Sequence, residues 1–321
     1  MYDLEFLKME GCGNDYVFVD CLRIPLPVDP GHLARVLSNR HTAVGADGLV
    51  LILPPWSSDT HAFIRMFNTD GTESSMCGTA LRCAALWLYQ SGHVTELSRL
   101  QIGQRIVVAE IRSSIAEQRA GVVTVKLGPP DRQTPVGSAH DFPEHDHSKR
   151  SDPKRFGPGM SEDSVSEPFL RRLEFELECL PPEGRTVLYV SIGNPHVVCF
   201  LNSIEGLEIS RVGPLIEHDV RFADRTNVDF VQKIDRRNAM VRVWERGCGE
   251  TRSCGSGACA VAVAGILAGE FDRSHPVSLR MPGGVLQVYW DVSDDLHLTG
   301  PVRETFRGTI RVDSVSATGN G

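Results

Sequence analysis

Two short segments of the chain carry the residues whose types and spacing are best suited to chemistry. Cys77 is followed by Gly-Thr and Cys254 by Gly-Ser, and each cysteine lies four residues after a glutamate. Each also opens a largely apolar run of the kind that forms a buried helix. The pattern therefore predicts two cysteines that each stand at the start of a helix.

A cysteine at a helix start can act as an acid or a base. The unpaired backbone N–H groups and the positive end of the helix dipole both stabilise a thiolate and lower the pKa of the thiol. The N–H groups that follow each cysteine can hold a carboxylate, and a glycine there lets the anion approach closely. The residues expected to bind it are Gly78, Thr79, Gly255 and Ser256.

The two segments belong to an internal repeat. Both cysteine motifs are related by an offset of 177 residues, which also aligns Arg65-Met-Phe-Asn68 with Arg242-Val-Trp-Glu245. Further upstream, an offset of 180 aligns Asn14 with Asn194 and places Asp47 opposite Asn227. Four matches in one order indicate that the chain contains two copies of one fold.

Two copies that meet across a cleft would place Cys77 and Cys254 on opposite sides of one ligand. That geometry suits racemisation of an amino acid, in which one group removes the α-proton and another returns a proton to the opposite face. The helix amides would stabilise the charge that develops on the carboxylate. No cofactor is then required.

The elements around the cysteines repeat in the same order. In each copy we expect a strand, a Gly-Asn turn, a second strand, a helix, two strands and the long apolar helix, at about 79–90 and 256–268. Late β-rich segments complete each half. The expected fold class is α+β, with two pseudo-symmetric domains, each a mixed β-sheet or barrel around a central apolar helix.

The expected domain boundaries follow from these elements. The first domain would span 1–130, with a C-terminal strand at about 302–318 returning to it, and the second would span 169–301. The intervening segment 131–168 is rich in Pro, Ser, His and charged residues, which predicts a flexible insertion or linker.

Charge, apolar run length and cysteine spacing argue against several classes of function. The formal net charge is -8, which argues against nucleic-acid binding through a broad basic face. No basic segment followed by an apolar run begins the chain, and no apolar run reaches the length of a membrane span, so we expect a cytoplasmic protein without membrane contact. The nine cysteines include no C-x-x-C pair, and we expect no metal site. Cys83 is expected to be an ordinary buried residue.

Several ordered motifs resemble those of diaminopimelate epimerases, a family of cofactor-independent amino-acid racemases. The resemblance runs from Leu7 to about Thr309, except in the central insertion. The motifs include Gly-Asn-Asp-Tyr at 13–16, Gly-Ala-Asp-Gly at 45–48, Gly-Asn-Pro-His at 193–196, Arg-Thr-Asn-Val at 225–228 and Trp-Glu-Arg-Gly at 244–247, besides the two Cys-Gly pairs.

The resemblance implies epimerisation of LL-diaminopimelate to the meso form, a step of lysine and peptidoglycan precursor synthesis. Cys77 and Cys254 would be the acid–base thiols, supported by His196 and Glu245. The remaining substrate contacts would come from Asn14, Gly48, Asn68, Asn194, Asn227 and Arg246, besides the helix-start residues and Glu245. Asp47 would brace its loop. A homodimer is compatible with this interpretation.

Some residues depart from the family pattern, and alternatives remain open. Thr79-Ala80-Leu81 stands where the family has Asn-Gly-Ala, so an amide side chain is lost while the backbone N–H is kept. Cys12 stands where an aliphatic residue is usual. The alternatives are another two-thiol racemase, of the histidine or proline racemase type, and a non-catalytic amino-acid binder or redox-sensing dithiol protein.

Overall fold

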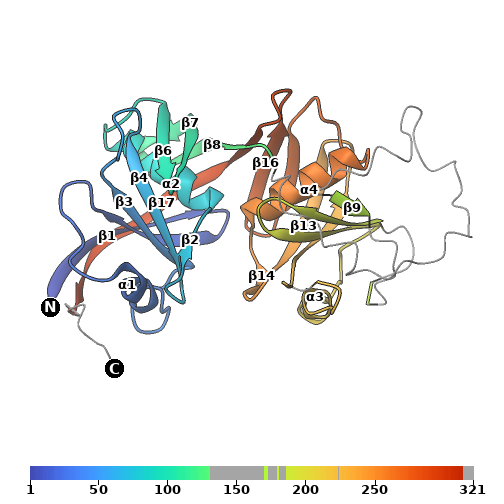
Figure 1. The fold of residues 1–321 in the computed structure, drawn as a ribbon, viewed down its shortest axis with the longest axis horizontal. Helices are drawn as coiled ribbons and strands as arrows, with labels where there is room; N and C mark the ends of the chain where they lie inside the picture. Colours follow the sequence, from blue (N-terminus) through green and yellow to red (C-terminus); the bar gives the residue numbers. More distant parts are fainter. Residues whose placement is uncertain (131–169, 173–178, 181–185, 223, 314–321) are drawn as a thin grey trace, which may run out of the picture. The chain divides into compact units, whose positions relative to one another are not determined.

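The computed structural model describes residues 1–130, 170–172, 179–180, 186–222 and 224–313. The chain divides into two compact units (Figure 1). The first comprises Met1–Gly128, Gly283–Leu286 and the chain from His297 onward, and the second comprises Pro129–Pro282 and Gln287–Leu296. The insertion expected at 131–168 lies outside the described residues.

The strands of the first unit close into a mixed barrel of eight. Around the ring, β17 pairs with β1, then β2, β3, β4, β6, β7 and β8, and β8 pairs with β17. The β2–β3 and β4–β6 pairs are parallel, whereas the β1–β2, β3–β4, β6–β7 and β7–β8 pairs are antiparallel. The bounds are β1 Tyr2–Gly11, β2 Asn14–Asp20, β3 Gly48–Leu53, β4 Ala62–Asn68, β6 Leu97–Ile102, β7 Arg105–Ile115, β8 Ala120–Gly128 and β17 Leu296–Val312. A short strand, β5 (Glu73–Ser74), pairs with β4, and a 3₁₀ turn follows β7 at Ala116–Gln118.

Helix α2 (Gly78–Gln90) contacts β1, β4, β6, β7 and β8, so the barrel strands surround it (Figure 1). Its residues from Thr79 to Leu88 are all buried. Helix α1 (Pro30–Leu37) packs instead against β3 and β4, and its Leu33 and Leu37 join the hydrophobic cluster that contains Leu49 and Leu51 of β3. Because α2 is apolar on nearly every side, it is stable only within such an enclosure.

The second unit repeats this arrangement. Its strands pair in the order β9, β10, β11, β12, β13 and β15, with β11–β12 and β13–β15 parallel. Helix α4 packs on β10, β11 and β12, and α3 packs on β12, β13 and β14. The bounds are β9 Leu170–Arg172, β10 Thr186–Ser191, β11 Pro195–Leu201, α3 Ile209–Glu217, β12 Asn227–Lys233, β13 Asn238–Glu245, β14 Gly249–Thr251, α4 Gly255–Leu267, β15 Val277–Met281 and β16 Gly284–Trp290. The expected fold class, two related domains of mixed strands around an apolar helix, is confirmed.

The strand register corrects one residue of the repeat alignment. Tyr16 pairs with Gly48 between β2 and β3, and His196 pairs with Asn227 between β11 and β12. Gly48, and not Asp47, is therefore the counterpart of Asn227. The alignment with Asp47 was wrong because the segment between the second and third strands of the repeat differs in length by one residue in the two copies.

Strand β6 was not predicted. Its six residues are Leu-Ser-Arg-Leu-Gln-Ile, and two of the buried ones, Ser98 and Gln101, are polar. Hydrophobic alternation is therefore too weak there to indicate a strand.

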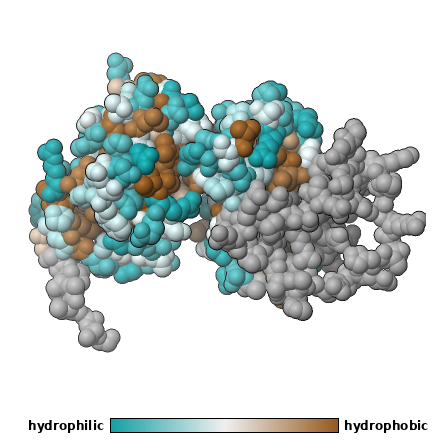
Figure 2. Space-filling view, turned by 45° about the horizontal axis from the view of Figure 1, so that its top comes forward, coloured by the Kyte–Doolittle hydropathy of each residue, from teal (hydrophilic) through white to brown (hydrophobic). Residues whose placement is uncertain are grey.

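No helix in the described part of the chain is long and apolar enough to span a bilayer. Polar and apolar residues are interspersed on the face shown in Figure 2.

Candidate active site

The thiol of the first unit lies at the N-terminus of α2, as predicted. Cys77 is the N-cap residue, with an extended backbone, and its Sγ accepts a hydrogen bond from the Ala80 N–H at 3.5 Å. The phenol oxygen of Tyr16, on β2, lies 3.2 Å from the same sulfur. The thiol is half-buried. The sulfur is therefore positioned both by the helix terminus and by a side chain from a neighbouring strand.

Strand ends of the barrel lie around Tyr16. Gly48 at the start of β3 pairs with Tyr16 on one side and with Asn68 at the end of β4 on the other. A Cβ on Gly48 would lie 2.3 Å from the Phe67 carbonyl oxygen and 2.9 Å from the Tyr16 ring. Only glycine therefore fits here. Asn14 begins β2, and the exposed Asn68 donates to the Thr72 hydroxyl.

A cluster of charges fixes the starts of β2 and β3. The buried Lys8 ammonium and the Arg40 guanidinium both pair with the Asp15 carboxylate, and Arg40 also pairs with Asp47 at 2.8 Å. The Asp15 N–H donates to the Asp47 carboxylate, and the Asp47 N–H donates to the Asp15 carbonyl. Although burial opposes it, hydrogen bonds from Arg40 and Lys8 lower the pKa of Asp15. Asp47 therefore braces its loop.

The thiol of the second unit occupies the equivalent place on α4. Cys254 is the N-cap residue, buried, and its Sγ accepts a hydrogen bond from the Gly257 N–H at 3.3 Å. The Ser256 hydroxyl lies 3.3 Å from the same sulfur. The two units thus present their cysteines in the same local geometry but with different side-chain partners.

Ser256 connects Cys254 to a buried acid–base pair. Its hydroxyl lies 3.2 Å from Nε2 of His196 and 3.4 Å from the side-chain nitrogen of Asn194. Nδ1 of His196 lies 2.8 Å from the Asp229 carboxylate, and both side chains are fully buried. A Cβ at Gly257 would lie 2.4 Å from Asp229 Oδ1, so this glycine makes room for the carboxylate. The result is a continuous chain of polar contacts from Asp229 to the thiol.

The other predicted residues of this unit gather at the ends of β12 and β13. The Asn227 side chain accepts from the Arg246 N–H at 3.0 Å and donates to the Pro195 carbonyl. Glu245 accepts from the Thr251 hydroxyl. The exposed Arg246 guanidinium donates to the carbonyl of Asp224 at 2.7 Å. Backbone groups therefore fix the Asn227 side chain, while the Arg246 guanidinium stays at the surface of its unit.

The two thiols differ electrostatically. Burial raises the pKa of Cys77, and the Tyr16 phenol, the amides of Ala80 and Thr79 and the Arg82 guanidinium counteract it. Burial, with the carboxylates of Glu245 and Asp229, raises the pKa of Cys254 well above its ordinary value. The pKa of each thiol is therefore raised rather than lowered, against the expectation for a helix start, because burial outweighs the helix amides. The pKa of Cys254 is raised further than that of Cys77, so Cys77 is the more readily ionised of the two.

Sequence reasoning missed two residues that touch this machinery, Tyr16 and Asp229. Tyr16 is the repeat counterpart of His196, so the offset of 180 residues was a signal that could have identified it. Asp229 is a carboxylate in the middle of an otherwise buried strand, which is unusual unless it has a partner. Cys83, expected to be buried, is fully so.

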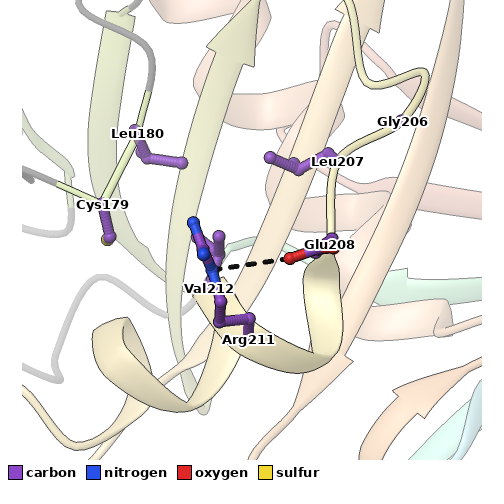
Figure 3. Close-up of a pocket in the computed structure, with 7 residues that line it drawn as sticks. All are labelled: Cys179, Leu180, Gly206, Leu207, Glu208, Arg211 and Val212. Atoms are coloured by element: carbon purple, nitrogen blue, oxygen red, sulfur yellow. Dashed lines mark ion pairs between the residues drawn. The ribbon is translucent and has the colours of Figure 1, made fainter.

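A separate hollow of about 400 Å³ lies beside the start of α3, lined by Cys179, Leu180, Gly206, Leu207, Glu208, Arg211 and Val212 (Figure 3). Arg211 and Glu208 form an ion pair in it at 3.6 Å. None of the predicted site residues lines this hollow. Among the described residues, no group of three or more His, Cys, Asp or Glu side chains could hold a metal ion.

Comparison with known proteins identifies the family of the chain. The family model for diaminopimelate epimerase matches residues 6–132 and 188–305. The chain belongs to the diaminopimelate epimerase family. A diaminopimelate epimerase of Moorella thermoacetica is 36% identical over 313 residues, covering 97% of this chain and all of that protein. One of Desulfovibrio desulfuricans is 39% identical, covering 95% and 97%.

Solved structures share the fold of this family at low identity. A predicted epimerase of Pseudomonas aeruginosa superposes with a TM-score of 0.60 at 15% identity, covering 97% of this chain and 100% of that one. A hydroxyproline epimerase of Agrobacterium vitis gives 0.61 at 13%, covering 99% and 93%. These likenesses concern the fold alone.

The half-buried carboxyl of Glu245 predicts a stability difference that depends on pH. Burial, reinforced by Asp229, raises its pKa, so the folded chain binds its proton more tightly than the unfolded chain does. Stability is therefore lost as the pH rises from about 4.3, the usual value of an unfolded glutamate, through the raised value. Glu245→Gln cannot lose stability in this way. The melting temperature of the variant minus that of the wild type should therefore be about 2–4 °C larger at pH 8 than at pH 4.

Calorimetry of both proteins across this range measures the difference. Glu205→Gln, which changes an exposed glutamate of the same unit, is the matched control and should give the same small difference at every pH. A Glu245→Gln difference that stays constant, or that shrinks as the pH rises, would contradict the assignment.

Proposed function

We propose that the chain epimerises LL-2,6-diaminopimelate to meso-diaminopimelate by a two-base mechanism with Cys77 and Cys254. The observation that carries the proposal is that these two cysteines each cap an enclosed helix at repeat-related positions. The family to which the chain belongs supports the reaction. The paired arrangement supports the mechanism, because inverting a carbon centre needs one group that removes a proton and another that donates one.

In the proposed reaction, one cysteine as thiolate takes the α-proton and becomes a thiol. The electron pair of the broken C–H bond moves onto the α-carbon and its carboxylate. The other cysteine, as thiol, then protonates the opposite face and becomes a thiolate. The net change is inversion with no gain or loss of atoms. Cys77, whose pKa is raised less than that of Cys254, is proposed to be the thiolate at the start, and Cys254 the thiol.

The amides of the two helix termini are proposed to bind the reacting carboxylate. The groups are the backbone N–H of Gly78, Thr79, Gly255 and Ser256, aligned with the positive ends of α2 and α4. The Thr79 side chain is buried and accepts a hydrogen bond from Arg82 at 3.4 Å. Its hydroxyl therefore belongs to the interior of the first unit, and replacement of the family's asparagine leaves the backbone donor in place. Stabilising charge in this way makes a carbonyl or pyridine cofactor unnecessary.

The remaining polar residues are proposed to recognise the substrate's amino groups and remote carboxylate. Arg246 offers a planar fork to a carboxylate, and its exposed guanidinium is accessible to one. Asn14, Asn68, Asn194, Asn227 and Glu245 supply neutral and anionic partners at strand ends. Gly48 leaves room beside Tyr16, and His196 supports Ser256. We further propose that the enzyme acts in the cytoplasm, in lysine and peptidoglycan precursor synthesis.

Removing either thiol should stop the reaction in both directions. Cys77→Ala and Cys254→Ala each delete one of the two groups that inversion needs, so kcat should fall by at least about 10³-fold. Cys83→Ala is the matched control, because Cys83 lies on the same helix as Cys77 and is fully buried in the barrel. The interconversion of the isomers is followed by chromatography. A Cys254→Ala enzyme with half the wild-type rate would exclude the two-base mechanism.

The substrate assignment is tested by comparing kcat/KM for LL-diaminopimelate, L-glutamate, L-histidine and L-proline on one preparation. L-Histidine and L-proline have no second carboxylate for the Arg246 fork to bind, a loss of about 1–3 kcal/mol, or on the order of 5- to 150-fold in selectivity, whereas the second carboxylate of L-glutamate stands on a shorter chain than that of diaminopimelate. Diaminopimelate should therefore be preferred. If histidine or proline is the better substrate, the chain is a racemase of that type, and the substrate part of the proposal is wrong.

A further inference from the structure

Tyr16, whose phenol lies beside Cys77, occupies a strand position that has a counterpart in the second unit. Tyr16 pairs with Gly48, and its counterpart His196 pairs with Asn227, in the same register of the same two strands. In the second unit the imidazole reaches the thiol through Ser256. In the first unit the phenol oxygen lies within 3.2 Å of the sulfur itself. The same strand position thus carries a polar side chain toward the helix cap in both units.

We propose that Tyr16 is a positioning residue for Cys77, whose phenol O–H donates a hydrogen bond to the thiolate and so directs the sulfur and favours its charged form. This inference rests on the proposed function, because it assigns how one of the two thiols is kept ready to act as a base. A hydrogen bond to a charged acceptor is stronger than one to a neutral acceptor, so Tyr16 stabilises the thiolate more than the thiol.

The structure holds the phenol in place from two sides. The Tyr16 ring lies over Gly48, where a Cβ would come within 2.9 Å of ring atom Cε1. The preceding residue, Asp15, is tied by Lys8 and Arg40, and its backbone exchanges hydrogen bonds with the Asp47 segment. The backbone at the start of β2 is therefore fixed, and the ring keeps its direction toward α2.

Tyr16 is one of several groups around Cys77 that favour its thiolate, and it acts from a different element than the others. From α2, the Arg82 guanidinium and the amides of Thr79 and Ala80 favour the thiolate, and from β2 the Tyr16 phenol favours it. Cys83, six residues further along the chain, is affected by Arg82 and Cys77 and also by Glu10 and Cys12 at the end of β1. Burial opposes the thiolate, so each hydrogen bond that favours it changes the charged fraction near neutral pH.

The test is the pH dependence of Cys77 alkylation by iodoacetamide, because only the thiolate reacts. The rate at Cys77 is followed by peptide mapping in the wild-type chain and in Tyr16→Phe, which removes one hydroxyl. In the variant, the midpoint of the profile should move up by about one pH unit, so that alkylation at pH 7 becomes about tenfold slower. Tyr2→Phe is the control, because this phenol lies in the same unit near Cys21 rather than Cys77, and its profile should match the wild type.

Turnover gives a second measurement. The kcat of Tyr16→Phe should fall at neutral pH and recover at higher pH, with KM unchanged, which a merely structural defect would not produce. A Cys77 alkylation midpoint that is unchanged or lowered in Tyr16→Phe overturns the inference. Alkylation does not require substrate, so a wild-type chain that shows the shift but does not epimerise diaminopimelate would refute the proposed function and leave the role of Tyr16 standing.

Discussion

The structure depends on the burial of two apolar helices, each among the strands of its own unit. Helix α2 has no polar face to offer water, and α4 is still more apolar, with residues 257–265 all buried. Such helices are stable only when strands cover them. Their first-turn amides, however, cannot bond within the helix and must find other partners. The cysteine at each N-cap supplies one of these partners, and so a packing constraint places a thiol where backbone donors converge.

The strand ends follow from the same constraint. Asn14, Gly48 and Asn68 lie where β2, β3 and β4 begin or end, and the parallel pairing of β2 with β3 places their starts together. In the second unit, Asn194, Asn227 and Glu245 occupy the corresponding places. The polar residues of the proposed site therefore collect at one end of each set of strands, while most of the interior is apolar.

The duplication preserved this framework and changed the groups that touch the sulfur. A neutral phenol and a guanidinium act on Cys77, whereas Cys254 lies near the carboxylates of Glu245 and Asp229 and contacts a serine linked to histidine. Two identical thiols in identical helix caps thereby acquire different proton affinities. A reaction that needs one acid and one base at the same moment benefits from that difference.

Much of this could be predicted from the sequence because the repeat is local and strongly patterned. The Cys-Gly pairs and the apolar runs after them specify two buried helices and their caps. Contacts between strands could not be predicted as well. Asp47 was aligned with Asn227 because a single sequence offset does not reveal that the segment between two strands is one residue longer in one copy. Tyr16 and Asp229 were missed because their importance depends on which side chain each strand turns toward the helix. Strand β6 was missed because it buries Ser98 and Gln101.

The central claim is that two different groups remove and return the proton, and epimerisation in D₂O tests it most directly. The wild-type chain is given LL-diaminopimelate, and product and remaining substrate are analysed by mass spectrometry during the first few per cent of conversion. The account predicts meso-diaminopimelate carrying one deuterium at the inverted α-carbon, because the second thiol has exchanged with solvent, while the remaining substrate keeps its protium. A product that retains the substrate's own proton would show that a single group removes and returns it, and would contradict the account.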